Sequence, residues 1–590
     1  DKLMVFICLA RNVQEMPVFR KIPLLFVLFL CVACKVESPP EVATSPQQAP
    51  ESVGTIDQPD KILIHNGRIY TMDQEFPMAD AMLFDSSGNI LELGEEQTML
   101  DAYPDAEHID LKGKTVIPGL IDAHAHLYGL ALSLSQAQLT DTASKEEAIQ
   151  RLREHETNLS EGEWLLGRGW DQNDWPVKEF PTREDLDSEF PDRPVWLRRI
   201  DGHAGWANSA ALAMADQDLS GDWQPQGGFI HRDAVGNASG VLIDGAMGLI
   251  EKAVPEVSRE LVKASLKLAL QQMVSLGLTG VHDMGVDRSV IELYREGIAS
   301  GDFPTRVYAF TDGAGETLDW LCENGAIEDE SGRLHMRAVK LYIDGAMGSR
   351  GAALLEDYSD DEGNSGLLFM PSADLEARID KSLACGFQVG VHAIGDRGNR
   401  VSLDALEASV ARYPDNPGRH RVEHAQTLTE VDIPRFADLG VIAAMQPTHA
   451  TSDMYWVEDR LGPARSPYAY AWRSLIDSGA RLALGSDFPV EKVNPMLGIH
   501  AAVTRQDVEG WPPGGWYPQE RLSREESVRG FTLDAAYSGF MEDIVGSLEA
   551  GKRADFIILD RDIFEVEAAD IAETRVLQTW LDGELVYSYH

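Results

Sequence analysis

Two histidines separated by one residue lie in the apolar run TVIPGLIDAHAHL, which spans positions 115–127. Because side chains alternate along a strand, His124 and His126 are expected to share one face and to lie a few Å apart. Two imidazoles placed in this way could bind one metal ion. The alternative is an ordinary pair of hydrogen-bonded strand histidines.

Three further side chains of metal-ligand type follow short aliphatic runs and precede loops. His392 lies in GFQVGVHAIGD, His424 in RHRVEHAQ and Asp487 in RLALGSDFP. Each of them alone could be a core or capping residue. Their order along the chain, after the His-x-His pair, predicts a shared metal site at the ends of successive strands.

The number of candidate strands predicts a barrel that brings these side chains together. Nine candidates lie between positions 115 and 487, and a (β/α)₈ barrel gathers its active site at the C-terminal ends of eight strands. The segment from His126 to LTGVHDMG, roughly 150 residues, is far longer than one crossover helix needs. We therefore assign PVWLRRIDGH to a long insertion after the first strand. The predicted fold class is α/β, a (β/α)₈ TIM-like barrel, with His124 and His126 on strand 1, Lys340 on strand 4, His392 on strand 5, His424 on strand 6 and Asp487 on strand 8.

The sequence resembles the amidohydrolase superfamily, and within it the YtcJ-like, N-substituted formamide deformylase-like metal-dependent hydrolases of amidohydrolase family 3. The resemblance extends from about Lys61 to Gly583. It is carried by PGLIDAHAHL, DGHAGWANSAAL, VKLYIDGAMGSRGAALLEDY, VGVHAIGDRGN, RVEHAQ, MQPTHATSDM, LALGSDFPV and GSLEAGKRADFIILD.

The resemblance implies a role for each candidate ligand. His124 and His126 would bind one divalent ion, His392 and His424 a second, and Asp487 would be both a ligand and the proton shuttle. Zn²⁺ is the expected metal at both positions. Lys340 would bridge the two ions as N6-carboxylysine, formed with CO₂ on an amine that burial beside cations keeps unprotonated. The alternative is a structural lysine that reaches solvent or pairs with Asp344, which would leave a site for one ion.

Four other residues are candidates for binding the substrate. His203 in RRIDGHAGWANS, the aromatic group around Trp170, and His449 in MQPTHATSDM match family motifs expected near the pocket mouth. Ordinary packing and hydrogen bonding is the alternative for all three. Arg350 could bind an anionic group of the substrate or form a salt bridge.

The reaction implied is metal-assisted hydrolysis, because a bound divalent ion lowers the pKa of water and polarises a carbonyl. We expect an amide-type C–N bond to be cleaved in an N-acyl, formamide or cyclic amide substrate. One alternative is an ester or lactone hydrolase that uses the same site. The other is a catalytically silent binding or regulatory lipoprotein, against which the complete ligand set argues.

Both flanks of the barrel read as short strands. Residues 61–115 include ILIHNGRIYTM, and residues 540–590 include GKRADFIILDRD and RVLQTWLDGELVY. In the superfamily the two ends pair into one small β-sandwich. The barrel would then occupy 116–539, with the insertion at about 128–270.

The N-terminal residues resemble an export signal. Residues 1–34 contain Met16 as a candidate start, a basic segment, and LLFVLFLCVAC, which ends at Cys34 as a lipobox does. A single anchoring helix is the alternative, although the apolar run is short for a bilayer. Residues 35–60 are rich in Pro, Ser and Gln and predict a tether. We expect a lipid-anchored periplasmic protein of the bacterial cell envelope.

The charge of the chain limits its partners. With 51 basic and 96 acidic residues, the net charge is -45, which argues against nucleic acid and anionic membrane surfaces. The expected partners are a small-molecule substrate and, through the lipid on Cys34, a membrane; a homodimer is left open. Cys322 and Cys385 lie in separate segments, so no disulfide is predicted.

Overall fold

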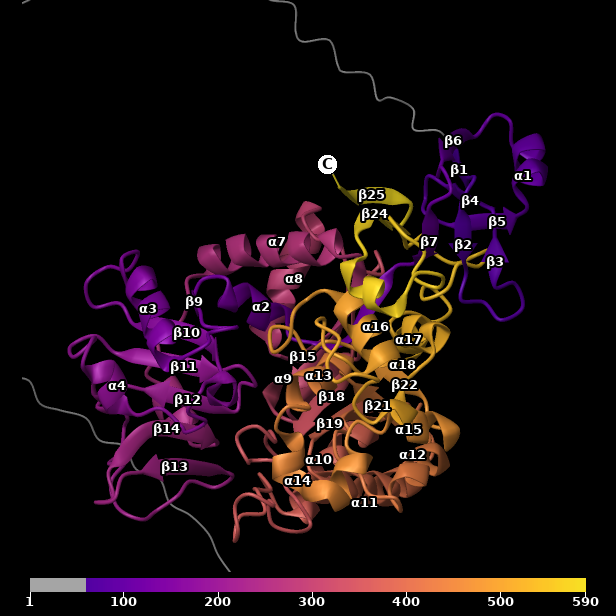
Figure 1. Cartoon of the computed structure of the whole chain (residues 1–590). Helices are drawn as coiled ribbons and strands as arrows, with labels where there is room; N and C mark the ends of the chain where they lie inside the picture. Colours follow the sequence, from indigo (N-terminus) through magenta and orange to yellow (C-terminus); the bar gives the residue numbers. More distant parts are fainter. Residues whose placement is uncertain (1–59, 590) are drawn as a thin grey trace, which may run out of the picture. The chain divides into compact units, whose positions relative to one another are not determined.

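The computed structural model describes residues 60–589 (Figure 1). Eight parallel strands form its central sheet, and each pairs with the next one along the path. This confirms the (β/α)₈ TIM-like barrel and the choice of its eight strands. In order they are β8 (Leu120–Ala125), β15 (Leu278–Val286), β16 (Arg306–Asp312), β18 (Leu334–Tyr342), β19 (Gln388–Ala393), β20 (Arg421–His424), β21 (Ile442–Met445) and β22 (Leu482–Leu484).

The last and first strands approach each other at the ends that carry the candidate ligands. The amide of Asp487 donates a hydrogen bond to the carbonyl of His124 at 2.7 Å. The carboxylate of Asp122 accepts from the amide of Ser486 at 3.0 Å. These contacts nearly close the barrel and hold Asp487 beside the His-x-His pair.

Helices cover the outside of the barrel, so its strands are buried on both faces, as in other parallel sheets. Every residue of β8 and of β19 is buried, and their apolar side chains pack against those of the helices. The main helices between the strands are α7 (Arg259–Ser275), α8 (Arg288–Ser300), α9 (Glu316–Asn324), α10 (Ser372–Ala384), α11 (Asp396–Arg412), α12 (Ile433–Leu439), α13 (Pro447–Asp453) and α15 (Trp472–Asp477).

The insertion after β8 forms a separate six-stranded sheet with its own apolar core. The segment PVWLRRIDGH contributes a strand to this sheet and lies outside the barrel, as predicted. The strand order is β13 (Gly228–Arg232), β14 (Ala238–Asp244), β12 (Ala204–Ala207), β11 (Val195–Arg199), β10 (Leu165–Trp170) and β9 (Ala137–Gln138).

The two ends of the chain pair in one further sheet. Its strand β7 (Thr115–Pro118) lies antiparallel to β23 (Phe556–Leu559), with Ile117 opposite Ile557. The remaining strands are β2 (Arg68–Tyr70) and β3 (Met78–Ala79) on one side, and β24 (Val576–Leu581) and β25 (Glu584–Ser588) on the other. A four-stranded sheet accompanies it, in the order β5 (Ile90–Gly94), β4 (Ala81–Asp85), β1 (Lys61–His65) and β6 (Glu107–Asp110).

The run TVIPGLIDAHAHL is two strands and not one. Its first half, β7, belongs to the composite sheet, whereas β8 belongs to the barrel. The chain passes from one to the other at Gly119, where a Cβ would lie 2.2 Å from Oγ1 of Thr279. Only glycine allows so close an approach without a shift of its neighbours.

Cys322 and Cys385 form a disulfide, which corrects the sequence-based expectation. Their Cα atoms are 5.3 Å apart although 63 positions separate them in the chain. Cys322 lies in α9 and Cys385 caps α10, and these helices follow the neighbouring strands β16 and β18. The barrel topology therefore brings together two cysteines that seemed unrelated in the sequence.

The predicted signal peptide and lipobox, and all but the last residue of the tether, lie outside the described residues. Among residues 60–589, no helix combines the length and apolar character needed to cross a bilayer.

Candidate functional site

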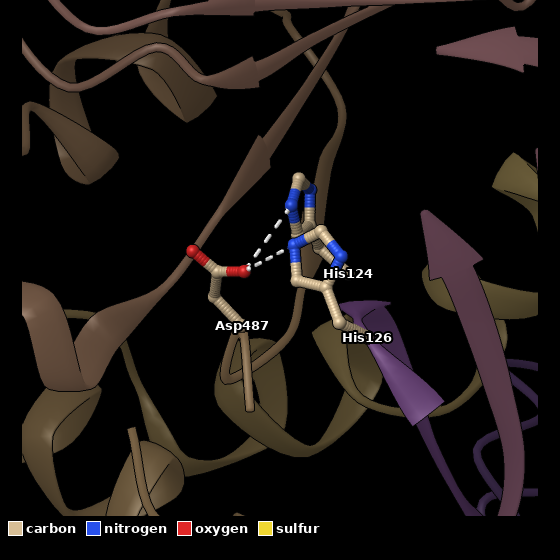
Figure 2. Close-up of side chains that lie close together, drawn as sticks. All are labelled: His124, His126 and Asp487. Atoms are coloured by element: carbon tan, nitrogen blue, oxygen red, sulfur yellow. Dashed lines mark ion pairs between the residues drawn. The ribbon is translucent and has the colours of Figure 1, made fainter. Parts of the chain in front are cut away.

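His124, His126 and Asp487 meet at the C-terminal end of the barrel (Figure 2). Nε2 of His126 lies 3.1 Å from Oδ1 of Asp487, and Nε2 of His124 lies 3.5 Å from the same oxygen. His124 lies on β8 and His126 directly follows that strand, whereas the carboxylate follows β22. One carboxylate oxygen is thus shared by the two imidazoles.

The other three candidate ligands surround this group. Nζ of Lys340 is 3.3 Å from Nε2 of His124. The ring of His424 lies 4.6 Å from that of His124 and 4.5 Å from that of His392, measured between centroids. The structure therefore brings together all six residues that the strand order grouped. Except for His124, all of them line one cavity of about 950 Å³.

His449 from α13 also reaches the site. Its Nε2 lies 3.7 Å from Oδ2 of Asp487, and its ring stacks over that of His424 with centroids 5.9 Å apart. His424, His449 and Asp487 offer three atoms close enough for one ion, as do His124, His126 and Asp487. His449 is therefore a candidate donor as well as part of the cavity wall.

The donor atoms fit a divalent cation. Within residues 60–589, Nε2 of His392 and Nε2 of His449 are buried without a hydrogen-bond partner. Buried polar atoms are rarely left in this state. Imidazole nitrogens together with a carboxylate oxygen are the ligands that zinc and similar ions bind.

Burial favours the protonation states that ligands need. It lowers the pKa of His124, His392 and His424 well below the usual value, so these imidazoles are neutral. It also lowers the pKa of Lys340 to about 8. Burial alone would raise the pKa of Asp487, but its contacts with His124 and His126 outweigh this effect and keep it ionised.

Outer hydrogen bonds orient the ligand rings. Nδ1 of His126 donates to the carbonyl of Met284 at 3.0 Å. Nδ1 of His424 donates to Oε1 of Gln446 at 2.8 Å. Each bond leaves Nε2 directed at the site, which is how ligating histidines are held in metalloproteins.

Glu423 orients the ring of His124 in the same way. This role of Glu423 was not predicted from the sequence. Its Oε2 lies 2.5 Å from Nδ1 of His124, and both side chains are buried. Glu423 precedes His424, so strand alternation predicts that only one of the two faces the site. His424, however, has a φ of 72°, and this left-handed residue breaks the alternation so that both side chains reach the site.

The comparisons with known proteins agree with this geometry. The profile of the amidohydrolase family matches residues 107–587. The chain belongs to this family. A putative amidohydrolase, YtcJ of Bacillus subtilis (strain 168), is 36% identical over 537 residues, which cover 89% of this chain and 99% of that protein.

Two further proteins similar to this chain are informative. The N-substituted formamide deformylase of Arthrobacter pascens is 30% identical over 548 residues, covering 89% of this chain and 98% of that protein. The crystal structure of an uncharacterised metal-dependent hydrolase from Pyrococcus horikoshii OT3 superposes with a TM-score of 0.70 at 28% identity. It covers 86% of this chain and 99% of that chain. Both relatives are described as hydrolases, in agreement with the family assignment.

Two of the predicted substrate-binding residues of this amidohydrolase lie elsewhere. Trp170 is fully buried in the core of the insertion, and its Nε1 donates to the carbonyl of Leu197 at 2.9 Å. A bulge at Gly169, with a φ of 106°, turns Trp170 away from the cavity. Arg350 pairs with Asp360 at 2.9 Å, so the salt-bridge alternative is correct.

The structure places the other two candidates, His203 and His449, in the wall of the cavity. Nδ1 of His203 is 2.6 Å from Oδ1 of Asp244, and its ring lies 5.0 Å from that of His392. Lys340 does not pair with Asp344, whose carboxylate instead accepts backbone N–H bonds that include one from Gly395 at 2.8 Å.

The buried ion pair between Arg421 and Glu423 predicts a large effect on the free energy of unfolding. Nε of Arg421 lies 2.8 Å from Oε1 of Glu423, and neither side chain is exposed. Arg421→Met should lower the free energy of unfolding by about 3–5 kcal/mol, because it leaves a buried carboxylate without its cation. Urea denaturation measures the effect. The control Arg350→Met removes a partly exposed pair and should cost less than about 1 kcal/mol. Equal losses in the two variants would contradict the assignment.

Proposed function

We propose that this amidohydrolase cleaves an amide-type C–N bond of an N-acyl, formamide or cyclic amide substrate with a metal-activated water. The proposal rests on the position of Oδ1 of Asp487, which lies within 3.5 Å of Nε2 of both His124 and His126. The formamide deformylase relative supports the choice of an amide bond.

Two groups of residues would hold the metal ions, for which we propose Zn²⁺. His124, His126 and Asp487 would bind one ion, and His392 and His424 the other. A divalent cation held by these groups would lower the pKa of a water molecule and polarise the substrate carbonyl. The buried Nε2 of His392, which lacks a hydrogen-bond partner, supports the second position.

Lys340 is proposed to be carboxylated and to bridge the two positions. Its Nζ lies 3.3 Å from a candidate ligand atom of His124. Its pKa of about 8 leaves a fraction of the amine neutral, and CO₂ can add to this amine with loss of one proton. The carbamate formed would place a negative charge among the imidazoles, which compensates two cations.

Asp487 is proposed to move the proton. As an ionised carboxylate beside the His-x-His pair, it can accept the proton of the attacking water. It can then deliver that proton to the nitrogen of the leaving amine, which is the role of a general acid-base group. His203 and His449 line the same cavity and are proposed to contact the substrate.

A substrate panel tests the reaction class directly. Metal-reconstituted protein would be assayed with N-acyl amino acids, N-substituted formamides, cyclic ureides and lactones. We expect turnover of at least one of the amide classes. Turnover of lactones alone would overturn the C–N assignment. Metal binding without turnover of any class would support the silent binding protein.

We also propose that the chain is exported and anchored to the bacterial cell envelope by a lipid on Cys34. The lipobox carries this proposal. The disulfide between Cys322 and Cys385 supports it, because such bonds persist in oxidising compartments and are rare in the cytosol.

A cysteine variant tests the anchor. Cys34→Ser should abolish incorporation of labelled fatty acid and release the protein from the detergent phase, because the thiol that carries the lipid is lost. Ser38→Ala, four residues downstream and outside the lipobox, is the control and should keep the label. Unchanged labelling of the Cys34→Ser variant would contradict the anchor.

A further inference from the structure

A single arginine of the insertion projects into the active-site cavity without a charged partner. Arg168 lies on β10 and lines the cavity together with the candidate ligands. Its Nη2 donates to the carbonyl of Ile200 at 3.0 Å, whereas its Nε is buried without a hydrogen-bond partner. Within residues 60–589, no carboxylate forms an ion pair with it.

The neighbouring arginines on the same wall are different. Arg199 is bound between Asp171 and Asp201. Arg198 is the register partner of Arg168 on the adjacent strand β11, and its Nε lies 3.0 Å from Oε1 of Glu251. All three line the cavity. Only Arg168 among them lacks a carboxylate, in a chain whose acidic residues outnumber its basic ones by 96 to 51.

The backbone is built to direct this side chain into the cavity. The bulge at Gly169 shifts the register between Arg168 and Trp170. Residues two apart on a strand normally share a face, but here Arg168 lines the cavity while Trp170 lies in the core of the insertion. A Cβ at position 169 would lie 2.3 Å from Oγ1 of Thr140, so the bulge requires glycine.

The charge of Arg168 persists at neutral pH. Burial, and next the nearby charge of Arg198, lower its pKa, but only to about 10. The protein thus keeps a cation with unused N–H donors in the wall of a cavity of about 950 Å³. Arg168 as a whole is partly buried, and a cation in this setting is costly unless an anion pairs with it.

We propose that Arg168 binds a carboxylate of the substrate, and that the substrates are N-acylated amino acids or similar N-acyl carboxylates. This inference rests on the proposed amide hydrolysis. A guanidinium presents paired N–H donors that match the two oxygens of a carboxylate. Asp171, Asp201 and Glu491 also line the cavity. Their negative charge favours a singly charged carboxylate over a doubly charged phosphate.

The geometry of the cavity fits such a molecule. Arg168 lies on the insertion, whereas the candidate metal ligands lie on the barrel, and both border the same space. An N-acyl amino acid could therefore place its amide at Asp487 and its carboxylate at Arg168. The insertion would then select the substrate, and the barrel would carry out the hydrolysis.

A pair of matched compounds tests the inference. N-formylphenylalanine carries the carboxylate, and N-formylphenethylamine is the same molecule without it. For the zinc-loaded full chain we expect kcat/KM to be at least about tenfold higher for the acid. In Arg168→Gln the value for the acid should fall about 100-fold, as when one partner of a buried charge pair is lost. The value for the neutral compound should change less than about threefold, since it lacks that contact.

Two further variants separate recognition from structure. Arg168→Lys keeps the positive charge and should retain more of the preference for the acid than Arg168→Gln. Arg198→Gln changes the register partner, which is already paired, and should leave the preference unchanged. An equal fall for both compounds in Arg168→Gln would mean that Arg168 only supports the loop at Ile200, and would overturn the inference.

Binding gives a readout that does not depend on turnover. Calorimetry with the Asp487→Asn variant would compare the dissociation constants of the two compounds, with and without Arg168→Gln. Tighter binding of the acid that depends on Arg168 supports the inference even if hydrolysis is absent, in which case the proposed function fails instead. Equal binding of the two compounds overturns the inference, whether or not the formamide bond is cleaved.

Discussion

Replacing Asp487 by asparagine is expected to lower hydrolysis by at least about 100-fold, the usual contribution of a general acid-base group. The amide keeps the shape of the side chain and one oxygen near His124 and His126, so the fold and much of the metal should remain. It cannot accept the proton of the attacking water. The loss should therefore be seen in kcat and much less in KM.

The control for this variant is Asp174→Asn, which changes an exposed carboxylate of the same cavity. It should retain nearly full turnover. Circular dichroism and metal analysis would confirm that the Asp487→Asn protein is folded and loaded. Turnover close to that of the wild type in this variant would remove Asp487 from the mechanism.

Lys340→Ala is expected to cost at least one metal ion and at least about 100-fold in activity, because even outer partners of a metal ligand contribute 10- to 100-fold. The lysine is buried beside His124, and alanine removes the only amine in the ligand cluster that CO₂ could modify. Metal content and kcat measured on the same preparation would show both losses.

A carboxylate should partly replace the missing group. Lys340→Glu supplies a fixed carboxylate and should retain more metal than Lys340→Ala, and added acetate should partly restore activity to the alanine variant. Two bound ions and normal turnover in Lys340→Ala would contradict a carbamate bridge. An unmodified amine in a metal-loaded crystal structure would do the same.

Much of the fold was predictable because parallel barrel strands have strong local signals. Most of the eight strands contain a short apolar run, and the ligand candidates stand at or near the ends of their strands. The His-x-His spacing alone predicted that His124 and His126 share a face. The length of the segment before LTGVHDMG was enough to predict that an insertion interrupts the barrel.

The residues that were misjudged depend on local backbone geometry or on contacts between distant segments. Glu423 reaches His124 because His424 adopts a left-handed φ, which strand alternation does not predict. Trp170 is buried because a bulge at Gly169 turns its side chain to the other face of the strand. Cys322 and Cys385 meet only once the barrel places α9 beside α10. A carboxylate directly before a predicted ligand, as in RVEHA, was the one signal in the sequence that pointed to Glu423.

The central claim is that the barrel site binds divalent metal and uses it to hydrolyse an amide. Elemental analysis of the purified full chain, together with its formamide-hydrolysing activity before and after chelation, tests this claim most directly. We predict about two equivalents of metal per chain, as in two-metal hydrolases, and a parallel loss and recovery of metal and activity. Full activity in metal-free protein, or no metal bound after reconstitution with Zn²⁺, would contradict the claim.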